Sequence, residues 1–124
     1  MKNALFFCNH EDRECVLESN LSYAIRDAYP VNVGHLLIIP RRHVTDFFDL
    51  QPNEIEDLMS LLWEAKERLA KDYRPDGFNV GVNVDTAAGQ TIPHVHIHLI
   101  PRYLGDVEDP TGGVRGVIPW KAKY

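Results

Sequence analysis

The feature that most constrains this chain is the run 93–102, in which three of its six histidines alternate with apolar residues. The histidines are His94, His96 and His98, and the apolar residues between and after them are Val95, Ile97 and Leu99. A period of two is typical of a β-strand, because successive side chains face opposite sides. The pattern therefore predicts a strand over 94–100 with the three imidazoles on one face and an apolar core face opposite.

The remaining pattern predicts more strands and one long helix. Strands are expected over 4–8, 14–19, 21–27, 35–40 and 78–84, where short apolar runs end at Gly, Pro or polar turns. A helix is expected over 52–72, because Pro52 suits a first turn and the apolar residues from Ile55 to Leu69 recur at helical spacing. The expected fold class is therefore α+β, a mostly antiparallel sheet with one long helix.

Length and charge narrow the class of protein. A chain of 124 residues fits one domain over 1–124, with a core at about 4–102 and an irregular tail over 103–124. The net charge of −5 argues against nucleic-acid binding and against an anionic membrane surface. Two cysteines without a CxxC pair favour a reducing, cytoplasmic setting. No run approaches the roughly 20 apolar residues of a membrane span, and the N-terminal apolar run is short for a signal peptide.

Three interpretations of the histidines compete. A His-x-His pair can chelate zinc, but the outer two of three such residues lie roughly 13 Å apart along a strand and scarcely converge on one ion. A single histidine on a strand is often purely structural, but three of them on one face of a short strand would be unusual in that role. The third interpretation is chemistry on phosphate, in which one imidazole attacks and its neighbours hold the oxygens.

The loop before the histidines favours the third interpretation. Residues 87–91 are small or polar, so their backbone N–H groups can approach an anion closely, and Gln90 and Thr91 add side-chain donors. Such a loop alone is a weak signal, and its direct connection to the histidine strand strengthens it. No metal site is predicted.

At this point the sequence resembles a known family. The run His94–Ile100 is similar to the histidine triad motif, His-φ-His-φ-His-φ-φ, of the HIT superfamily of nucleotide hydrolases and transferases. Gly34–Pro40, Ala88–Thr91 and Pro101-Arg102 are similar to further family segments. The 21–24 run, Gln90-Thr91 and Pro101-Arg102 resemble the Fhit-like branch, which splits dinucleoside polyphosphates. Trp120 resembles the Hint branch, which hydrolyses nucleoside phosphoramidates.

The resemblance implies catalytic roles for four histidines. His96 matches the nucleophile, which attacks the α-phosphate and becomes nucleotidylated on Nε2 before water releases a nucleoside monophosphate. His98 matches a phosphate contact, and His94 matches a residue that supports the orientation of the nucleophile. His35 matches a supporting histidine that packs behind the triad.

The resemblance also implies substrate contacts. Asp27 matches a ribose ligand, and a carboxylate suits a diol because it accepts two hydrogen bonds; turn capping would be a purely structural role for the same residue. Asn83 matches a polar residue near the ribose or phosphates, and a strand-end role would explain it equally well. Gly89, Gln90 and Thr91 match groups near the phosphates and the leaving oxygen. Three further residues could line the base pocket or simply pack in the core: Phe6, Ile25 and Leu37.

The expected function is hydrolysis of dinucleoside polyphosphates through a nucleotidyl-histidine. A Hint-like phosphoramidase, a phosphorolytic transferase and a non-catalytic nucleotide-binding module are also compatible with the sequence. No tightly bound cofactor is expected, and any Mg²⁺ would arrive with the nucleotide. The resemblance implies a homodimer formed through the long helix and an adjacent strand, with Leu61 and Trp63 as candidate contacts. Structural zinc in some relatives needs an N-terminal CxxC, which this chain lacks; His10 and His43 are expected to be exposed.

Overall fold

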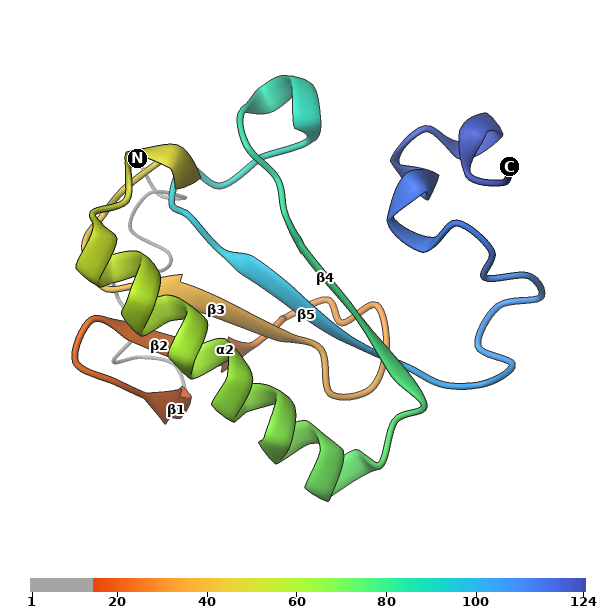
Figure 1. Cartoon of the computed structure of the whole chain (residues 1–124), viewed down its shortest axis with the longest axis horizontal. Helices are drawn as coiled ribbons and strands as arrows, with labels where there is room; N and C mark the ends of the chain where they lie inside the picture. The colour runs from red at the N-terminus through yellow and green to blue at the C-terminus, as the bar shows by residue number, and fades with distance from the viewer. Residues whose placement is uncertain (1–14) are drawn as a thin grey trace.

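Five strands form one antiparallel sheet in the order β1-β2-β3-β5-β4 (Figure 1). The computed structural model describes residues 15–124, so the strand expected over 4–8, Phe6 and His10 lie outside the described residues. The strands are β1 Cys15–Glu18, β2 Ser22–Arg26, β3 Leu36–Pro40, β4 Gly77–Val82 and β5 Ile97–Arg102. The expected α+β class with a mostly antiparallel sheet is confirmed.

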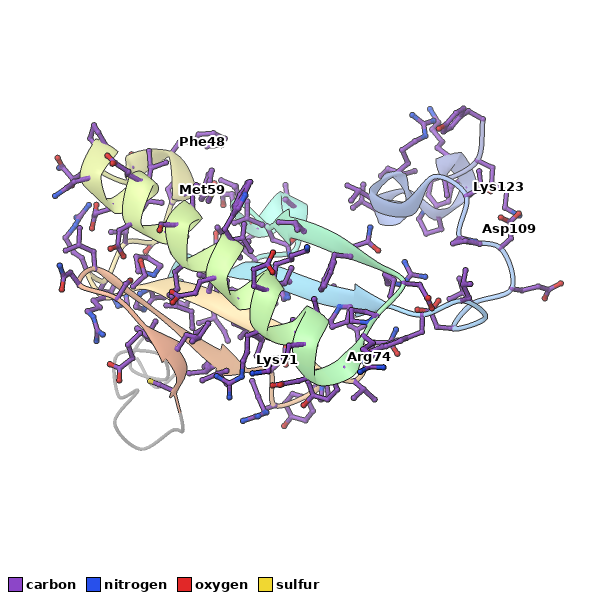
Figure 2. The ribbon with its side chains drawn as sticks, turned by 60° about the horizontal axis from the view of Figure 1, so that its bottom comes forward. Phe48, Met59, Lys71, Arg74, Asp109 and Lys123 are labelled. Atoms are coloured by element: carbon purple, nitrogen blue, oxygen red, sulfur yellow. The ribbon has the colours of Figure 1, made fainter. Side chains whose placement is uncertain are left out.

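The long helix, α2 (Pro52–Tyr73), crosses one face of the sheet (Figure 1). It begins with a capping interaction, in which the Gln51 N–H donates to Glu54 Oε1 at 2.7 Å. The buried Glu54 carboxylate also accepts two hydrogen bonds from Arg42, at 2.8 and 2.9 Å. The helix ends at Tyr73 and is capped by the next residue, Arg74 (Figure 2), whose φ of 51° is left-handed. Helical periodicity therefore predicted this element to within one residue.

The two faces of the sheet have different partners. The helix-facing core is apolar and comes from alternate strand positions, among them Ala24, Leu36, Ile38, Ile97 and Leu99, packed on Leu58, Leu61, Leu62, Ala65 and Leu69 of the helix. The opposite face carries a smaller apolar cluster formed by Tyr23, Ile25, Leu37 and Ile39. Side chains of β5 that point away from the helix therefore reach a face that α2 does not cover.

The histidine strand begins later than expected, at Ile97 rather than His94. Ile97 pairs with Ile38 of β3 and with Val82 of β4, and neither ladder extends further. Before it, the Val95 N–H donates to the Val44 carbonyl at 2.7 Å instead of to a strand. Because the segment 94–96 is hydrogen-bonded to a loop, it lies outside the paired part of the sheet.

The chain after β5 runs out beyond the sheet and ends in two short 3-10 helices, η4 (Gly113–Val117) and η5 (Pro119–Lys121) (Figure 1). Two more short 3-10 helices, η2 (Phe47–Asp49) and η3 (Thr86–Ala88), lie in the loops before α2 and β5. The tail is otherwise irregular, as expected, and Lys123 closes it through a 2.9 Å ion pair with Asp109 (Figure 2). Over residues 15–124, no helix has the length and apolar character needed to cross a membrane.

Candidate active site

A pocket of about 270 Å³ lies on the face of the sheet opposite α2. Seven residues that the sequence pointed to line it: Asp27, Leu37, Asn83, Gly89, Thr91, His96 and His98. Three more come from the same loops: Ala28, Tyr29 and Ile92. The pocket therefore gathers the end of β2, the loop before β5 and two of the three triad histidines.

His96 has its ring orientation set by the backbone of the triad itself. Its Nδ1 lies 2.8 Å from the carbonyl oxygen of His94. A carbonyl only accepts hydrogen bonds, so Nδ1 carries the proton and the lone pair of the neutral ring is on Nε2. This is the protonation state that a nucleophilic imidazole needs.

His94 contributes through its backbone rather than its ring. The ring is fully buried, and its Nε2 lies 2.9 Å from the carbonyl oxygen of Pro40. It also packs against His43, with 4.8 Å between ring centroids. Burial lowers the pKa of His94, so the ring is neutral. The alternation is confirmed in that Val95, Ile97 and Leu99 all pack in the helix-facing core, but His94 does not line the pocket that His96 and His98 share.

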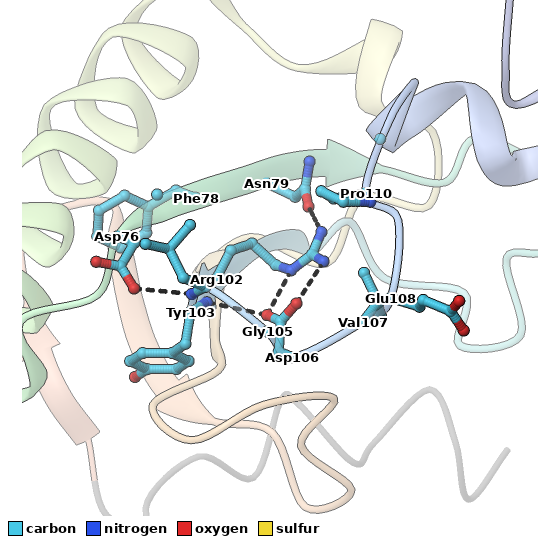
Figure 3. Close-up of a pocket in the computed structure, with 13 residues that line it drawn as sticks. Asp76, Phe78, Asn79, Arg102, Tyr103, Gly105, Asp106, Val107, Glu108 and Pro110 are labelled. Carbon is cyan, nitrogen blue, oxygen red and sulfur yellow. Dashed lines mark hydrogen bonds and ion pairs between the residues drawn. The ribbon is translucent and has the colours of Figure 1, made fainter.

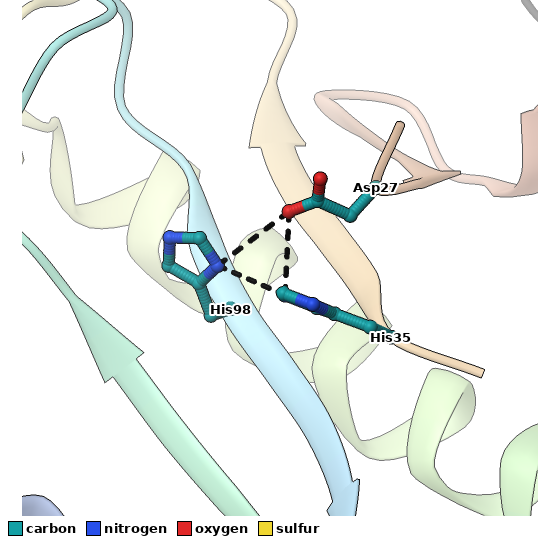
Figure 4. A group of neighbouring side chains, drawn as sticks. All are labelled: Asp27, His35 and His98. Atoms are coloured by element: carbon teal, nitrogen blue, oxygen red, sulfur yellow. Dashed lines mark hydrogen bonds and ion pairs between the residues drawn. The ribbon is translucent and has the colours of Figure 1, made fainter. Parts of the chain in front are cut away.

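His35 and His98 form a hydrogen-bonded pair, in which His35 is buried and His98 lines the pocket. The Val31 N–H donates to His35 Nδ1 at 3.0 Å, so the neutral His35 ring carries its proton on Nε2. That Nε2 lies 3.0 Å from Nδ1 of His98. His98 therefore accepts at Nδ1 and keeps its own proton on Nε2, the nitrogen that points away from His35 (Figure 4).

Both members of this pair are neutral. Burial lowers the pKa of His35, although the Asp27 carboxylate opposes the shift. Burial above all, with the crowding of His98 against two other imidazoles, lowers the pKa of His98 to about 4, and the Asp27 carboxylate opposes the shift. At neutral pH, His98 is thus a neutral donor whose ring stands 5.2 Å from that of His96, centroid to centroid.

Asp27 follows β2 and contacts both the turn and the histidine pair. Its Oδ1 accepts the Tyr29 N–H at 2.8 Å, which is the turn-capping role that the sequence also allowed. Its Oδ2 lies 3.4 Å from His35 Nε2 and 4.0 Å from His98 Nδ1 (Figure 4). The carboxylate is therefore both a structural cap and part of the pocket wall.

Asp27, His35 and His98 have the spacing of a three-ligand metal site, since their ligand atoms lie within 4.8 Å of one another. The tautomer of His35 argues against such a site. Its Nδ1 lone pair accepts the Val31 N–H, so the Nε2 that would face a metal carries the proton. These three residues fit a hydrogen-bond chain better than zinc, because a ligating nitrogen must present a lone pair.

Gln90 does not occupy the predicted position. Its Nε2 donates to the carbonyls of Thr45 and Ile92, at 2.9 and 3.1 Å, and its Oε1 accepts the Asp85 N–H at 2.8 Å. The side chain is nearly buried and is not among the residues that line the pocket. The expectation that it contacts the phosphates is therefore corrected: its amide is used to hold the loop. Thr91 and Gly89 do face the pocket.

The candidate base-pocket residues separate in the structure. Leu37 lines the pocket, whereas Ile25 is buried in the cluster beneath it.

A larger cavity of about 390 Å³ lies between β4 and the start of the tail (Figure 3). Its main charged group, Arg102, is held by Asp106 and Asn79, at 2.8 and 2.6 Å. That cavity is lined by the tail and contains none of the histidines.

Some site residues had no signal in the sequence. The Val31 amide, the His94 carbonyl and the Val44 carbonyl act through the backbone, which any residue supplies. A partial clue was Pro40, which ends β3 beside the ring of His94.

In comparison with known protein families, the chain matches the HIT domain over residues 9–105. The chain is 39% identical over 112 residues to a protein named AP-4-A phosphorylase from Mycobacterium tuberculosis, covering 88% of this chain and 57% of that protein. It is 36% identical over 91 residues to an asymmetrical bis(5'-nucleosyl)-tetraphosphatase from Schizosaccharomyces pombe, covering 73% of this chain and 50% of that one. The chain thus spans about half the length of these relatives.

The fold is also similar to those of solved HIT family structures. A HIT family protein from Bacillus anthracis superposes with a TM-score of 0.77 at 34% sequence identity, covering 82% of this chain and 74% of that one. The matched family segment contains the pocket, the His35–His98 pair and all three triad histidines. On this evidence the chain belongs to the HIT domain family.

Proposed function

We propose that this protein cleaves dinucleoside polyphosphates at the α-phosphate through a covalent nucleotidyl-His96 intermediate. The observation that carries the proposal is the hydrogen bond between His96 Nδ1 and the His94 carbonyl, which leaves the Nε2 lone pair on the neutral ring. The names of the relatives support the substrate class, since both refer to diadenosine or dinucleoside tetraphosphates.

The reaction has two displacements. In the first, His96 Nε2 forms a bond to the α-phosphorus, and the bond from that phosphorus to the bridging oxygen breaks, which releases a nucleoside polyphosphate. In the second, water attacks the same phosphorus, the P–N bond breaks, and its electron pair returns to Nε2. The proton of the attacking water passes to solvent, and a nucleoside monophosphate is released. A covalent intermediate of this kind splits one difficult step into two easier ones.

His98 stabilises the charge that develops on the phosphate oxygens. With its proton on Nε2, the neutral ring donates a hydrogen bond to a non-bridging oxygen. Thr91 lines the same pocket and supplies a hydroxyl donor. Gly89 also lines it, but its N–H donates to the Thr86 carbonyl at 2.9 Å, so Gly89 shapes the pocket wall and is not a donor to the phosphate. Any Mg²⁺ is proposed to ride on the polyphosphate, because this ion is usually held by substrate phosphates and water.

The acceptor in the second displacement distinguishes a hydrolase from a phosphorylase. We favour water as the acceptor. Incubation of diadenosine tetraphosphate with enzyme and excess phosphate tests this choice, since water gives adenosine monophosphate and ATP whereas phosphate gives adenosine diphosphate and ATP. Adenosine monophosphate as the main product supports hydrolysis; adenosine diphosphate that rises with phosphate concentration assigns the protein as a phosphorylase.

A phosphoramidase and a non-catalytic binding module have weaker support at the site. Trp120, the residue that resembles the Hint branch, is 81% exposed in the tail and does not line the histidine pocket. A phosphoramidase activity would be detected as faster turnover of an adenosine phosphoramidate than of diadenosine tetraphosphate. A nucleotide-binding module would bind diadenosine tetraphosphate without releasing product.

We also propose a homodimer formed through α2 and β4. Trp63 is 70% exposed beside an apolar groove lined by Leu62, Phe78 and Val80, and β4 is the last strand of the sheet. Leu61 was an expected contact, but it is buried in the core and is not available. Sedimentation analysis of wild type and Trp63→Glu tests the proposal: a dimer that dissociates in the variant supports it, and a wild-type monomer contradicts it.

A further inference from the structure

Two groups that can accept a proton lie near Nε2 of His35, and one of them, His98, is hydrogen-bonded to it. Nδ1 of His98 lies at 3.0 Å and Oδ2 of Asp27 at 3.4 Å. Since the Val31 N–H occupies His35 Nδ1, the His35 ring has one proton to share between them. A carboxylate attracts such a proton strongly, so the shorter contact to His98 competes with the more strongly charged contact to Asp27.

The state of this proton determines what His98 presents to the pocket. When His35 donates to His98, the Nε2 of His98 keeps its proton and faces away from the pair as a donor (Figure 4). When His35 turns its proton to Asp27, Nδ1 of His98 loses its donor. The His98 ring is then no longer held in one tautomer, and a lone pair can face the substrate phosphate instead.

Asp27 is also accessible from the pocket. Its side chain is 17% exposed and forms part of the wall of the pocket. Its Oδ1 accepts the Tyr29 N–H, and its Oδ2 is the oxygen nearest the two histidines. A carboxylate repels phosphate, so the part of a nucleotide that suits this wall is a hydrogen-bond donor, and the vicinal hydroxyls of a ribose supply two.

We propose that Asp27 couples ribose binding to the tautomer of His98. Hydroxyl groups that donate to Oδ2 compete with His35 for the carboxylate, so the His35 proton is directed fully to Nδ1 of His98. His98 then presents its Nε2–H to the phosphate at the moment when a complete nucleotide is in place. Asp27 is in this account a positioning residue for His98 as well as a ribose ligand. The inference rests on the proposed nucleotide site.

The first experiment reads the histidines directly, without turnover. The ring nitrogens of His35 are followed by ¹⁵N NMR in the whole protein while adenosine monophosphate or its 2′,3′-dideoxy analogue is added. His35 is 2% exposed, so its resonances report the contact with Asp27 rather than contact with the nucleotide. The expected result is that the ribose form shifts His35 Nε2 and the dideoxy form does not, and that Asp27→Asn abolishes the difference.

The second experiment measures catalysis as a cycle of two substrates and two enzymes. Diadenosine tetraphosphate is compared with the analogue whose sugars lack both hydroxyls, on wild type and on Asp27→Asn. In the wild type, the dideoxy substrate is expected to lower kcat by about fivefold or more, beyond any rise in KM. In Asp27→Asn the loss in kcat should nearly vanish, because the amide cannot hold the His35 proton as a carboxylate does. Glu56→Gln, an acid-to-amide change on the exposed side of α2, is the matched control and should behave as wild type.

The outcomes separate the coupling from the site on which it rests. If both nucleotides bind and shift His35 equally, or if the dideoxy substrate raises only KM, the coupling is wrong and the nucleotide site stands. If the difference between substrates persists in Asp27→Asn, another residue carries it and the proposal is again wrong. If neither nucleotide binds, the proposed function and the coupling fail together.

Discussion

Nδ1 of His96 lies 2.8 Å from the carbonyl oxygen of His94, two residues earlier in the same segment. The contact is possible because 94–96 precede the ladder of β5 and are anchored instead to the loop at Val44. A regular strand points successive carbonyls sideways to its neighbours, where they are used by the sheet. The break in regularity before Ile97 is therefore what sets the tautomer of the proposed nucleophile.

Loss of the nucleophile should abolish turnover and preserve the fold. His96→Ala is expected to reduce kcat/KM for diadenosine tetraphosphate by at least about 10³-fold, since the covalent route depends on this imidazole. Glu56→Ala, which removes an exposed side chain of α2 outside the pocket, should stay within about twofold. Steady-state kinetics with thermal melting checks both variants. Near-wild-type turnover in a folded His96→Ala protein would rule out the assignment.

His35 should affect kcat more than KM. His35→Phe keeps an aromatic ring in the buried space and removes the Nε2–H that holds His98. Because one preorganised donor to phosphate is then lost, kcat is expected to fall by roughly 10²-fold with little change in KM. Val31→Ala is the matched control, because it changes the same contact region but keeps the N–H that donates to His35. A rise in KM at constant kcat would show that His35 serves binding rather than positioning.

Acid should destabilise the folded protein through its buried histidines. The pKa of His98 falls from the ordinary 6.5 to about 4 on folding, so between these values the unfolded chain binds a proton that the folded chain does not. The free energy of unfolding therefore decreases as the pH falls through this window, by about 3 kcal/mol for His98. The lowered pKa values of His35 and His94 act in the same direction.

Urea denaturation at about pH 7 and about pH 4 measures this loss. The decline should be smaller in His98→Asn than in the wild type, because that variant has one fewer proton to take up on unfolding. An equal decline in both proteins would mean that His98 is not held neutral by the fold.

Gln90 and Thr91 should behave differently although they are adjacent. Gln90→Ala removes three hydrogen bonds to backbone groups and is expected to destabilise the protein by about 1–3 kcal/mol. Thr91→Ala removes a hydroxyl at the pocket and should change KM or kcat with stability within about 0.5 kcal/mol. Thermal melting and kinetics on both variants check this. A stable Gln90→Ala protein with a selective loss of substrate affinity would show that Gln90 contacts phosphate after all.

The sequence predicted the elements well because their patterns are local. The apolar spacing of α2 and the apolar run of β3 are each visible within a few residues, and both elements lie where they were expected. The start of β5 was missed because a strand also needs partners, and the ladders that pair β5 with β3 and with β4 both stop at Ile97. Alternation alone does not reveal where a neighbouring strand stops.

The site was predicted in its residue types and less well in its contacts. His96, His98 and Asp27 line one pocket as the resemblance implied, although their roles remain proposals. Gln90 was misplaced because an amide suits a phosphate and a backbone carbonyl equally well, and its partner Thr45 is 45 residues away in the sequence. The chain from Val31 through His35 to His98 begins at a main-chain N–H, so no residue pattern could have signalled it.

The central claim is a covalent bond between His96 and a nucleotide, and intact mass spectrometry tests it most directly. The protein is mixed briefly with diadenosine tetraphosphate, quenched in base and weighed, with His96→Ala treated in parallel. The account predicts a mass increase of one adenylyl group in the wild type, mapped to His96 and absent from the variant, while adenosine monophosphate accumulates. Product formation with no adduct at any quench time, or an adduct that persists in His96→Ala, would contradict it.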